Sequence, residues 1–319
     1  MTADADAILR AARILRDGGI VSFPTETVYG LGARVDDGRA VARIFEAKNR
    51  PSFDPLIVHI ARIEELDALV SGVTPLALRL IERFWPGPLT LVLPKKDLVP
   101  DIVTAGLPSV GVRMPAHPVA RALIEETGVP LAAPSANPFG YISPTTASHV
   151  EEQLGERVDL ILDGGPCAVG VESTIVKISG DGYTLLRPGG VTVEEIEMLA
   201  GARLADASGA RAVPEAPGQM NQHYSPRTPV RVVKSFKEIG PRTGRCGLIA
   251  FMDPHDAPGF ERIEVLSPTG DLREAAARLF ASLHELDRLG LDVIYAEEVP
   301  EEGVGRAIMN RLRRAASRG

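Results

Sequence analysis

The sequence predicts an α/β fold, in which a twisted mixed sheet with flanking helices is followed by a smaller Rossmann-like α/β domain. Short apolar runs alternate with longer amphipathic segments along the 319-residue chain, as strands and helices packed in layers do. The connections between them are short and rich in glycine and proline. A composition of 45% hydrophobic and 24% charged residues is typical of a globular chain long enough for two domains.

The first two-thirds of the chain is expected to form the larger sheet and its helices. An amphipathic helix is predicted over residues 4–17, because Gly18 and Gly19 follow its last turn. The apolar run 20–23 then forms a strand that ends at Pro24. The same patterns predict helices over 38–47, 62–70, 74–84 and 117–127, and strands over 56–60, 89–93, 110–114, 131–135, 159–165 and 173–179.

The composition changes near residue 202. Alanine, glycine, proline and serine dominate residues 202–229 without periodicity, which predicts a linker. Beyond it the alternation returns, with strands expected at 230–235, 245–251 and 292–298 and helices at 272–290 and 305–317. We therefore expect a larger domain over 1–201, a linker or lid over 202–229 and a small α/β domain over 230–319.

Charge and cysteine content argue against several classes of protein. A formal net charge of −7 is unfavourable for broad adhesion to nucleic acid or to an anionic membrane, so a nucleic acid is not expected as a direct substrate. Cys167 and Cys246 are far apart and lack CxxC spacing, which argues against a disulfide framework or a thiolate zinc site. Without a signal peptide or an apolar run long enough to cross a membrane, the chain is expected to be cytoplasmic.

Polar and charged side chains cluster where the predicted strands end. The stretch SFPTETVYGLG leaves small hydroxyls and glycine amides open to a small anionic group. Lys48 and Arg50 suit phosphate oxygens, although they could equally be a solvated helix end. Arg113, in an apolar strand, requires an anionic partner, which is either an internal carboxylate or the carboxylate of a ligand. A lone histidine on a strand, such as His59, is more often a hydrogen-bonded core residue than a ligand.

Further small donors follow other strands, and they either form turns and helix caps or line a ligand site. They are Ser135, Asn137, Ser143 and Thr145, then Ser173, Thr174 and Arg187. Neither GxSxG nor GxxxxGK[ST] is present, GxGxxG is incomplete, and the motifs include no Cys/His metal cluster. The pattern indicates a nucleotide or other polyanion beside a small carboxylate, with catalysis by positioning and charge and without a covalent nucleophile.

Ordered motifs along the chain resemble those of the threonylcarbamoyl-AMP synthases, whose catalytic domain is YrdC-like. These motifs are FPTETVYGLG, KNRPSFDPLIVHI, FWPGPLTLVL, SVGVRMP, APSAN followed by SPT, GVESTIV and LRPGG. The segment PGQMNQHYSPRTPV and the C-terminal tail resemble the two-domain form with a small C-terminal domain. The resemblance covers almost the whole chain.

The resemblance implies a nucleotidyltransferase reaction. L-threonine, bicarbonate and ATP would give threonylcarbamoyl-AMP and pyrophosphate with Mg²⁺, and no protein side chain is assigned to the metal. Separate tRNA threonylcarbamoyl transferase proteins would then use the product to modify adenosine 37 of tRNAs that read ANN codons.

The resemblance also implies the site residues. L-threonine would be held by Thr27, His59, Arg113, the Ala133 backbone and Ser173; ATP by Arg50, Asp54, Ser109, Ser135, Ser143, Arg187 and Tyr224; and Lys48 and Arg50 would stabilise charge. Asp54 stands where asparagine is common, which puts a direct ATP contact there in question, whereas Ser109 keeps the hydroxyl of the commoner threonine.

The linker contains Asn221, His223 and Tyr224, which predict a lid that folds over the ligand; the alternative is a plain spacer. Two other functions are alternatives to the synthase. An RNA-binding module of the same fold would lack catalysis. A carbamoyl transferase or hydrogenase-maturation protein would carry zinc-finger cysteine pairs and an acylphosphatase-like segment, and this chain has neither.

Overall fold

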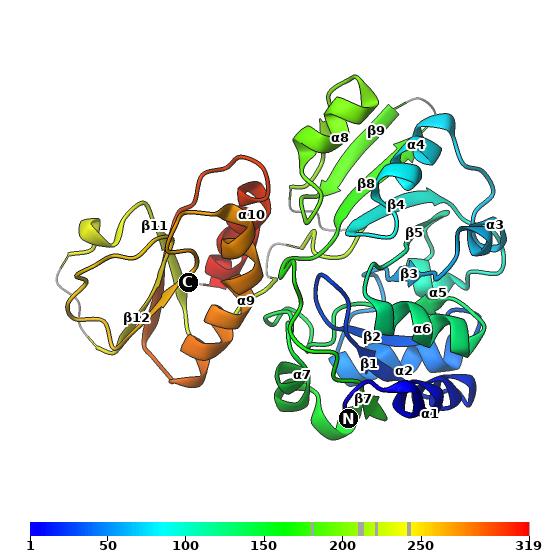
Figure 1. The fold of residues 1–319 in the computed structure, drawn as a ribbon, viewed down its shortest axis with the longest axis horizontal. Coiled ribbons are helices and arrows are strands. Elements are labelled where there is room, and N and C mark those ends of the chain that lie inside the picture. Colours follow the sequence, from blue (N-terminus) through cyan, green and yellow to red (C-terminus); the bar gives the residue numbers. More distant parts are fainter. Residues whose placement is uncertain (180–181, 210–213, 221–222, 241–243, 319) are drawn as a thin grey trace.

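The computed structural model describes residues 1–179, 182–209, 214–220, 223–240 and 244–318. A ten-stranded sheet and a four-stranded sheet form two parts that lie side by side (Figure 1). The predicted fold class, a mixed α/β sheet with helices and a smaller α/β domain, is confirmed. Of the helices that the described residues form, none has the length and apolar character needed to span a bilayer.

The ten-stranded sheet mixes parallel and antiparallel pairs in the order β10-β9-β8-β4-β5-β3-β6-β2-β1-β7. Its strands are β1 (Val21–Phe23), β2 (Gly30–Arg34), β3 (Ile57–His59), β4 (Leu89–Pro94), β5 (Ser109–Arg113), β6 (Leu131–Ala132), β7 (Leu160–Ile161), β8 (Thr174–Ser179), β9 (Gly182–Arg187) and β10 (Ala205–Asp206). The helices with it are α1 (Ala5–Arg16), α2 (Gly38–Lys48), α3 (Leu66–Leu69), α4 (Pro75–Phe84), α5 (Asp101–Thr104), α6 (Pro118–Thr127), α7 (Ala147–Gln153) and α8 (Val193–Ala200).

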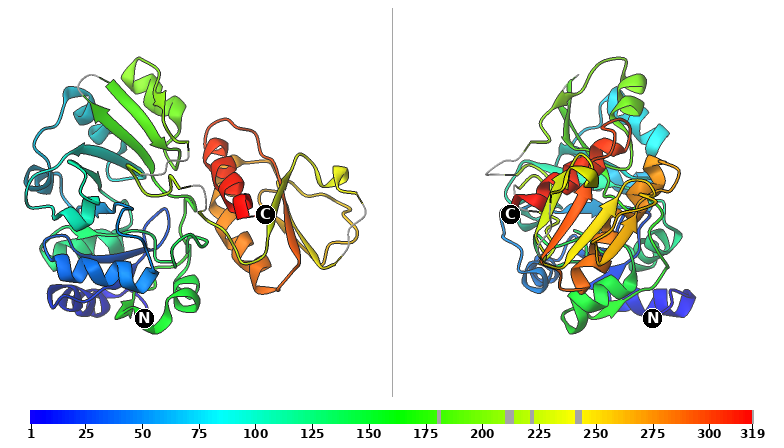
Figure 2. Two further views of the ribbon diagram at one scale, coloured as in Figure 1. Left: turned by 180° about the vertical axis from the view of Figure 1, so that it is seen from behind. Right: turned by 90° about the vertical axis from the view of Figure 1, so that its left-hand side faces the viewer.

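The smaller sheet is all parallel, in the order β11-β14-β12-β13. It consists of β11 (Val230–Val233), β12 (Cys246–Ala250), β13 (Arg262–Val265) and β14 (Val293–Glu297), with the helices α9 (Leu272–Arg288) and α10 (Gly305–Ala315). Both helices lie between this sheet and the larger part of the molecule, as Figures 1 and 2 show.

Two departures from the predicted elements have a clear physical reason. Residues 30–34, for which the sequence patterns predicted no strand, form β2, and glycine is needed there because a Cβ on Gly32 would lie 2.7 Å from a ring carbon of Phe23 in β1. Inside the predicted linker, Ala205 and Asp206 add a short parallel strand beside β9. Backbone pairing of this kind leaves little trace in side-chain periodicity.

A hydrophobic cluster joins the two parts of the molecule. Val28, Ile142 and Val171 of the larger part pack in the same buried cluster as side chains of α9 and α10. Tyr224 of the linker is also in this cluster and is fully buried. The C-terminal domain therefore packs directly against the motifs FPTETVYGLG and GVESTIV of the larger domain.

A stacked histidine pair lies in the same interface. His149 of α7 and His284 of α9 have ring centroids 4.0 Å apart, and His284 Nε2 lies 3.2 Å from the Ser143 carbonyl oxygen. Burial and the nearby Arg288 lower the pKa of His149 to about 4, although Glu152 opposes the shift. Burial and His149 lower the pKa of His284 to about 3. Both rings are therefore neutral near pH 7.

We expect acid to destabilise the chain through this pair. Below pH 6.5 an unfolded histidine takes up a proton, whereas the folded pair does so only near pH 3 to 4. The free energy of unfolding should therefore fall by about 2 kcal/mol per histidine between pH 7.5 and pH 5, as urea unfolding would measure. Substitution H284Q should reduce this loss and H255Q, at a side chain 90% exposed, should not; equal pH profiles for both would contradict the assignment.

Candidate active site

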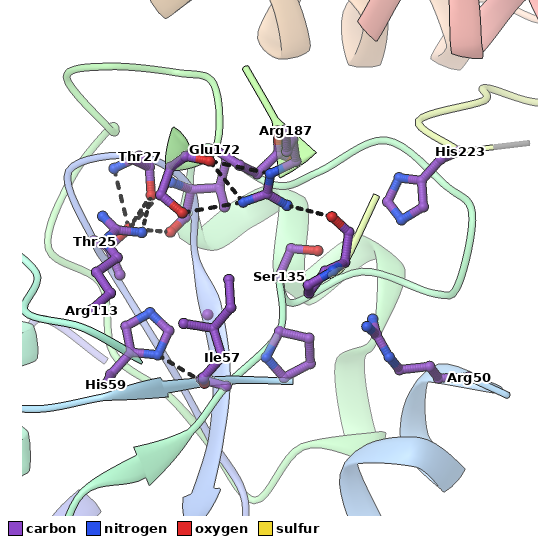
Figure 3. A pocket seen from close by; sticks show the side chains of 16 residues that line it. Thr25, Thr27, Arg50, Ile57, His59, Arg113, Ser135, Glu172, Arg187 and His223 are labelled. Atoms are coloured by element: carbon purple, nitrogen blue, oxygen red, sulfur yellow. Dashed lines mark hydrogen bonds between the residues drawn. The ribbon is translucent and has the colours of Figure 1, made fainter. Parts of the chain in front are cut away.

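A pocket in the larger domain gathers side chains from distant segments of the chain (Figure 3). The predicted residues that line it are Thr27, Arg50, His59, Arg113, Ala133, Ser135, Ser173 and Arg187. Its other lining residues are Thr25, Val28, Gly30, Ile57, Pro134, Glu172, Pro217 and His223. The remaining predicted residues, Lys48, Asp54, Ser109, Ser143 and Tyr224, lie outside this lining.

Strand pairing explains why the predicted residues converge. Strands β3 and β5 are parallel, and their last residues, His59 and Arg113, face each other in register. Strands β8 and β9 are antiparallel, and Ile175 pairs with Arg187, so that the start of one strand lies beside the end of the other. Ser173, which directly precedes β8, is thereby placed next to Arg187.

Arg113 has an internal anionic partner. Its Nη1 donates to Thr27 Oγ1 at 2.9 Å, and its Nη2 lies 2.6 Å from Glu26 Oε1. The sequence required an anionic partner for Arg113 without identifying it, and the structure shows that Glu26 is an internal one. Both side chains are largely buried, at 4% and 12% exposure, yet Arg113 still lines the pocket, where a second anion can approach it.

The ring of His59 is neutral. Burial and the charge of Arg113 lower the pKa of His59 to about 3, although a contact with the Ile57 carbonyl oxygen opposes the shift. In Figure 3, His59 and Arg113 lie at one end of the pocket and Arg50 and His223 lie at the other. The pocket thus has two ends of different composition.

Arg50 and Asp54 form a buried ion pair. Arg50 Nη2 lies 2.9 Å from Asp54 Oδ2, and the guanidinium also donates to the carbonyl oxygens of Asp54 and Pro55. Burial raises the pKa of Asp54, and Arg50 opposes this shift. Asp54 is therefore the counterion of an arginine that lines the pocket, which explains how an acid is accommodated at this position.

Lys48 holds a loop beside the pocket. It is the last residue of α2, which ends at Asn49 in the left-handed conformation with φ of 51°. Its Nζ donates to the carbonyl oxygens of Ser135, at 2.6 Å, and Asn137. Burial and the neighbouring Arg50 hold the pKa of Lys48 well below its ordinary value. The lysine is only 1% exposed and does not line the pocket itself.

Glu172 is a buried acid that the sequence reasoning missed. Ser143 Oγ donates to its Oε1 at 2.6 Å, and Arg311 Nε donates to its Oε2 at 2.8 Å. Burial alone would raise the pKa of Glu172, but Arg311, Arg187 and Ser143 lower it to about 2. The signal was available in GVESTIV, because a charge among apolar and hydroxyl residues needs a partner for the same reason as Arg113.

Arg187 and the linker close one side of the pocket. Arg187 donates to the carbonyl oxygen of Ser173 at 3.0 Å and to that of Pro217 at 3.2 Å. Pro217 and His223 both line the pocket, whereas Asn221 lies outside the described residues. Tyr224 is outside the lining, and its ring contacts both the ring of Phe280 and the guanidinium of Arg311.

Ser109 lies apart from this pocket. It lines a neighbouring cavity with Glu215, Ala216 and Pro217 of the linker. The linker residue Pro217 lines both spaces, so the two are neighbours along one face of the sheet. The part of the chain that the structure describes contains no group of three or more His, Cys, Asp or Glu side chains able to hold a metal ion.

The turn after Arg187 presses against the backbone of residues 172–174, where β8 begins. A Cβ on Gly189 would lie 2.3 Å from the Glu172 carbonyl oxygen and 2.4 Å from the Thr174 nitrogen, and both are backbone atoms. We expect G189A to destabilise the chain by about 1–3 kcal/mol in thermal unfolding and to lower activity, because the two segments must separate. G72A is the control, since no described atom lies within 4 Å of a Cβ there; equal stability of the two variants would contradict this expectation.

The fold and the pocket define a class: an α/β protein with a pocket that is lined by buried arginines and hydroxyl groups. A family model described as "Telomere recombination", which covers Sua5, YciO and YrdC proteins, matches residues 13–189. A second model, "Threonylcarbamoyl-AMP synthase, C-terminal domain", matches residues 191–317.

Relatives of known identity agree over nearly the full length. Threonylcarbamoyl-AMP synthase from Pyrococcus abyssi is 45% identical over 96% of this chain and 93% of its own. The Bacillus subtilis protein of that name is 44% identical over 97% and 92%. The crystal structure of P. abyssi Sua5 complexed with L-threonine has a TM-score of 0.89 at 44% identity, and covers 97% of this chain and 94% of that one.

The chain belongs to the two-domain, Sua5-type threonylcarbamoyl-AMP synthases, and its activity is the synthesis of threonylcarbamoyl-AMP. It is a nucleotidyltransferase of tRNA modification, from an ATP-using family. The resemblance read from the sequence motifs is confirmed. An RNA-binding module without catalysis is thereby set aside.

Proposed function

We propose that this pocket joins L-threonine, bicarbonate and ATP to give threonylcarbamoyl-AMP and pyrophosphate. The observation that supports this best is the convergence of Arg50, Arg113 and Arg187 on one pocket. Three guanidinium groups that line one cavity suit a triphosphate beside a small carboxylate, because charge-assisted hydrogen bonds to phosphate and carboxylate oxygens are strong.

L-threonine is assigned to the end of the pocket that holds Arg113 and His59. Arg113 would bind the carboxylate of L-threonine. Thr27, which already accepts a hydrogen bond from Arg113, would form a further hydrogen bond with a polar group of L-threonine. Neutral His59, the Ala133 backbone and Ser173 complete this end. The L-threonine complex of the P. abyssi relative supports a threonine site in this fold.

ATP is assigned to the other end and to the neighbouring cavity. Arg50, Ser135 and Arg187 line the pocket there, and Ser109 extends the surface under the linker. Ser143 and Tyr224 are outside the lining of the pocket. We assign them to ATP from the motifs, and their side chains would have to move slightly to contact it. Asp54 is assigned to this region as the counterion that holds Arg50.

The chemistry requires two steps between anions. The threonine amine combines with bicarbonate to give a carbamate with loss of water. A carbamate oxygen then attacks the α-phosphorus of ATP, the bond to the β-phosphate oxygen breaks, and pyrophosphate leaves. Arg50, Arg187 and Lys48 would offset the charge that develops, and no covalent enzyme intermediate is needed.

Mg²⁺ fits as an ion that ATP brings with it. Glu172 is the one carboxylate among the described lining residues, and Ser143 and Arg311 already occupy both of its oxygens. Phosphate oxygens and water are the usual ligands of Mg²⁺ at such sites. When bound, the ion would neutralise phosphate charge.

The linker, residues 202–229, is proposed to act as a lid between domains 1–201 and 230–319. Pro217 and His223 lie at the pocket, and a closed lid keeps water from the labile carbamate and adenylate. We further propose that the enzyme works in the cytoplasm and passes its product to separate tRNA threonylcarbamoyl transferase proteins. Direct tRNA binding is not expected at a net charge of −7.

The test is pyrophosphate release by the purified chain. We expect release from ATP only when L-threonine, bicarbonate and Mg²⁺ are all present, and threonylcarbamoyl-AMP should appear in equal amount. Omission of each component in turn is the control. Release at an unchanged rate without threonine would contradict the proposed reaction.

A further inference from the structure

One arginine of the C-terminal domain reaches across to the catalytic domain. Arg311, on α10, is fully buried and is the largest such side chain in the described chain. Its Nε donates to Glu172 Oε2 at 2.8 Å, and its Nη1 donates to the Pro188 carbonyl oxygen at 2.8 Å. Its guanidinium carbon lies 5.1 Å from the ring centroid of Tyr224.

Each of these contacts fixes a neighbour of the proposed ATP site. The second oxygen of Glu172 accepts a hydrogen bond from Ser143, so Arg311 orients that serine through the carboxylate. Pro188 directly follows Arg187 in the turn after β9. Tyr224 is held by the cation above its ring. The guanidinium of Arg311 thus contacts Tyr224 directly and reaches Ser143 and Arg187 through their neighbours Glu172 and Pro188; all three residues are assigned to ATP.

Burial of a guanidinium at this place needs a reason beyond packing. An apolar side chain of similar volume usually serves an interface as well as a buried ion pair does. In addition, Arg311 Nη2 is buried without a hydrogen-bond partner among the described residues. A planar fork that links a carboxylate, a carbonyl and an aromatic ring is the geometry of a residue that fixes orientation.

We propose that Arg311 is a positioning residue for the ATP end of the active site, supplied by the C-terminal domain. The inference rests on the proposed function, since the ATP assignments come from there. It gives the small domain a task in catalysis: its α10 holds Glu172, the turn after Arg187 and the linker residue Tyr224 in place.

Arg113, at the threonine end, is held differently, which makes the inference selective. Arg113 takes its contacts from Thr27, Glu26 and the Gly87 carbonyl oxygen, all in the catalytic domain. Loss of Arg311 should therefore disturb ATP binding and leave L-threonine binding nearly intact. A general loosening of the fold would disturb both.

The experiment measures pyrophosphate release by the full-length chain with R311M, E172Q and the double variant. R311M is expected to raise KM for ATP about tenfold or more, because small misplacements of binding groups have large effects, while KM for L-threonine changes less than about threefold. E172Q should act in the same direction. The double variant should be no worse than the more severe single variant, because the two residues act as one unit.

Arg288 provides the matched control. It joins the same two domains through Glu152, with Nε at 2.9 Å from Oε2, but both side chains are partly exposed and neither lines the pocket. R288M should keep both KM values. R311K is measured in parallel, since it retains a charge without the fork and is expected to restore at most part of the ATP affinity.

Either of two results would overturn the inference: an unchanged KM for ATP in R311M, or a rise in both KM values that R288M reproduces. If R311M does not fold, R311K and E172Q decide in the same way. Failure of the proposed function has a different signature, because the unmodified chain would then release no pyrophosphate with all substrates present.

Discussion

Replacement of Arg113 by methionine is expected to lower kcat/KM for L-threonine about a hundredfold to a thousandfold. The variant loses the cation assigned to the threonine carboxylate and leaves Glu26 without its partner at 2.6 Å. The unpaired carboxylate would then repel the ligand, and loss of one partner of a buried charge pair has effects of this size. Initial rates of pyrophosphate release at varied threonine concentration measure the change.

The companion variant is E26Q, which removes the internal competitor for Arg113. If Arg113 serves the ligand, E26Q should retain activity within about tenfold, because Thr27 still orients the guanidinium. The opposite ranking, with R113M active and E26Q inactive, would show that the arginine only neutralises Glu26.

Replacement of Lys48 by methionine is expected to lower kcat about a hundredfold. The lysine is 1% exposed and donates to the carbonyl oxygens of Ser135 and Asn137, so its loss leaves two buried acceptors unsatisfied and frees the loop that presents Ser135. The same assay, at saturating substrates, measures the change. KM for L-threonine is expected to change less than kcat, because L-threonine is assigned to the other end of the pocket.

Lys95 is the control for Lys48. Its Nζ also donates to a carbonyl oxygen, that of Val99 at 3.1 Å, but Val99 does not line the pocket, whereas Ser135 does. K95M should therefore keep kcat. Full activity of K48M, with Tm lowered as in K95M, would contradict a role for Lys48 in the site.

The convergence of the pocket could be predicted from the sequence because charge in an apolar strand is informative. Arg113 and Arg187 end strands, and strand ends of one sheet meet at common edges. The same argument applied to Glu172 would have found that acid as well. What could not be predicted is the partner of each charge, since Glu26 and Arg311 come from segments far away in sequence.

Other features escaped prediction for reasons of backbone geometry. The strand Gly30–Arg34 was not predicted because glycine is uncommon in strands, and here its glycines make room for the ring of Phe23. Ser109 lies outside the main pocket, in a cavity that linker residues 215–217 help to line, and the sequence patterns did not predict a position for the linker. The contacts of the predicted residues with substrates stay predictions.

The cluster that Val28, Ile142 and Val171 share with α9 and α10 has a consequence for any shorter version of this protein. A chain cut after residue 201 would turn these three aliphatic side chains toward solvent, and the excised C-terminal piece would lose their cover. The larger fragment would keep its own core, which consists of residues before 201, but each fragment would expose an apolar face that the other now covers. A variant without the second domain would therefore need polar residues in place of Val28, Ile142 and Val171 to remain soluble.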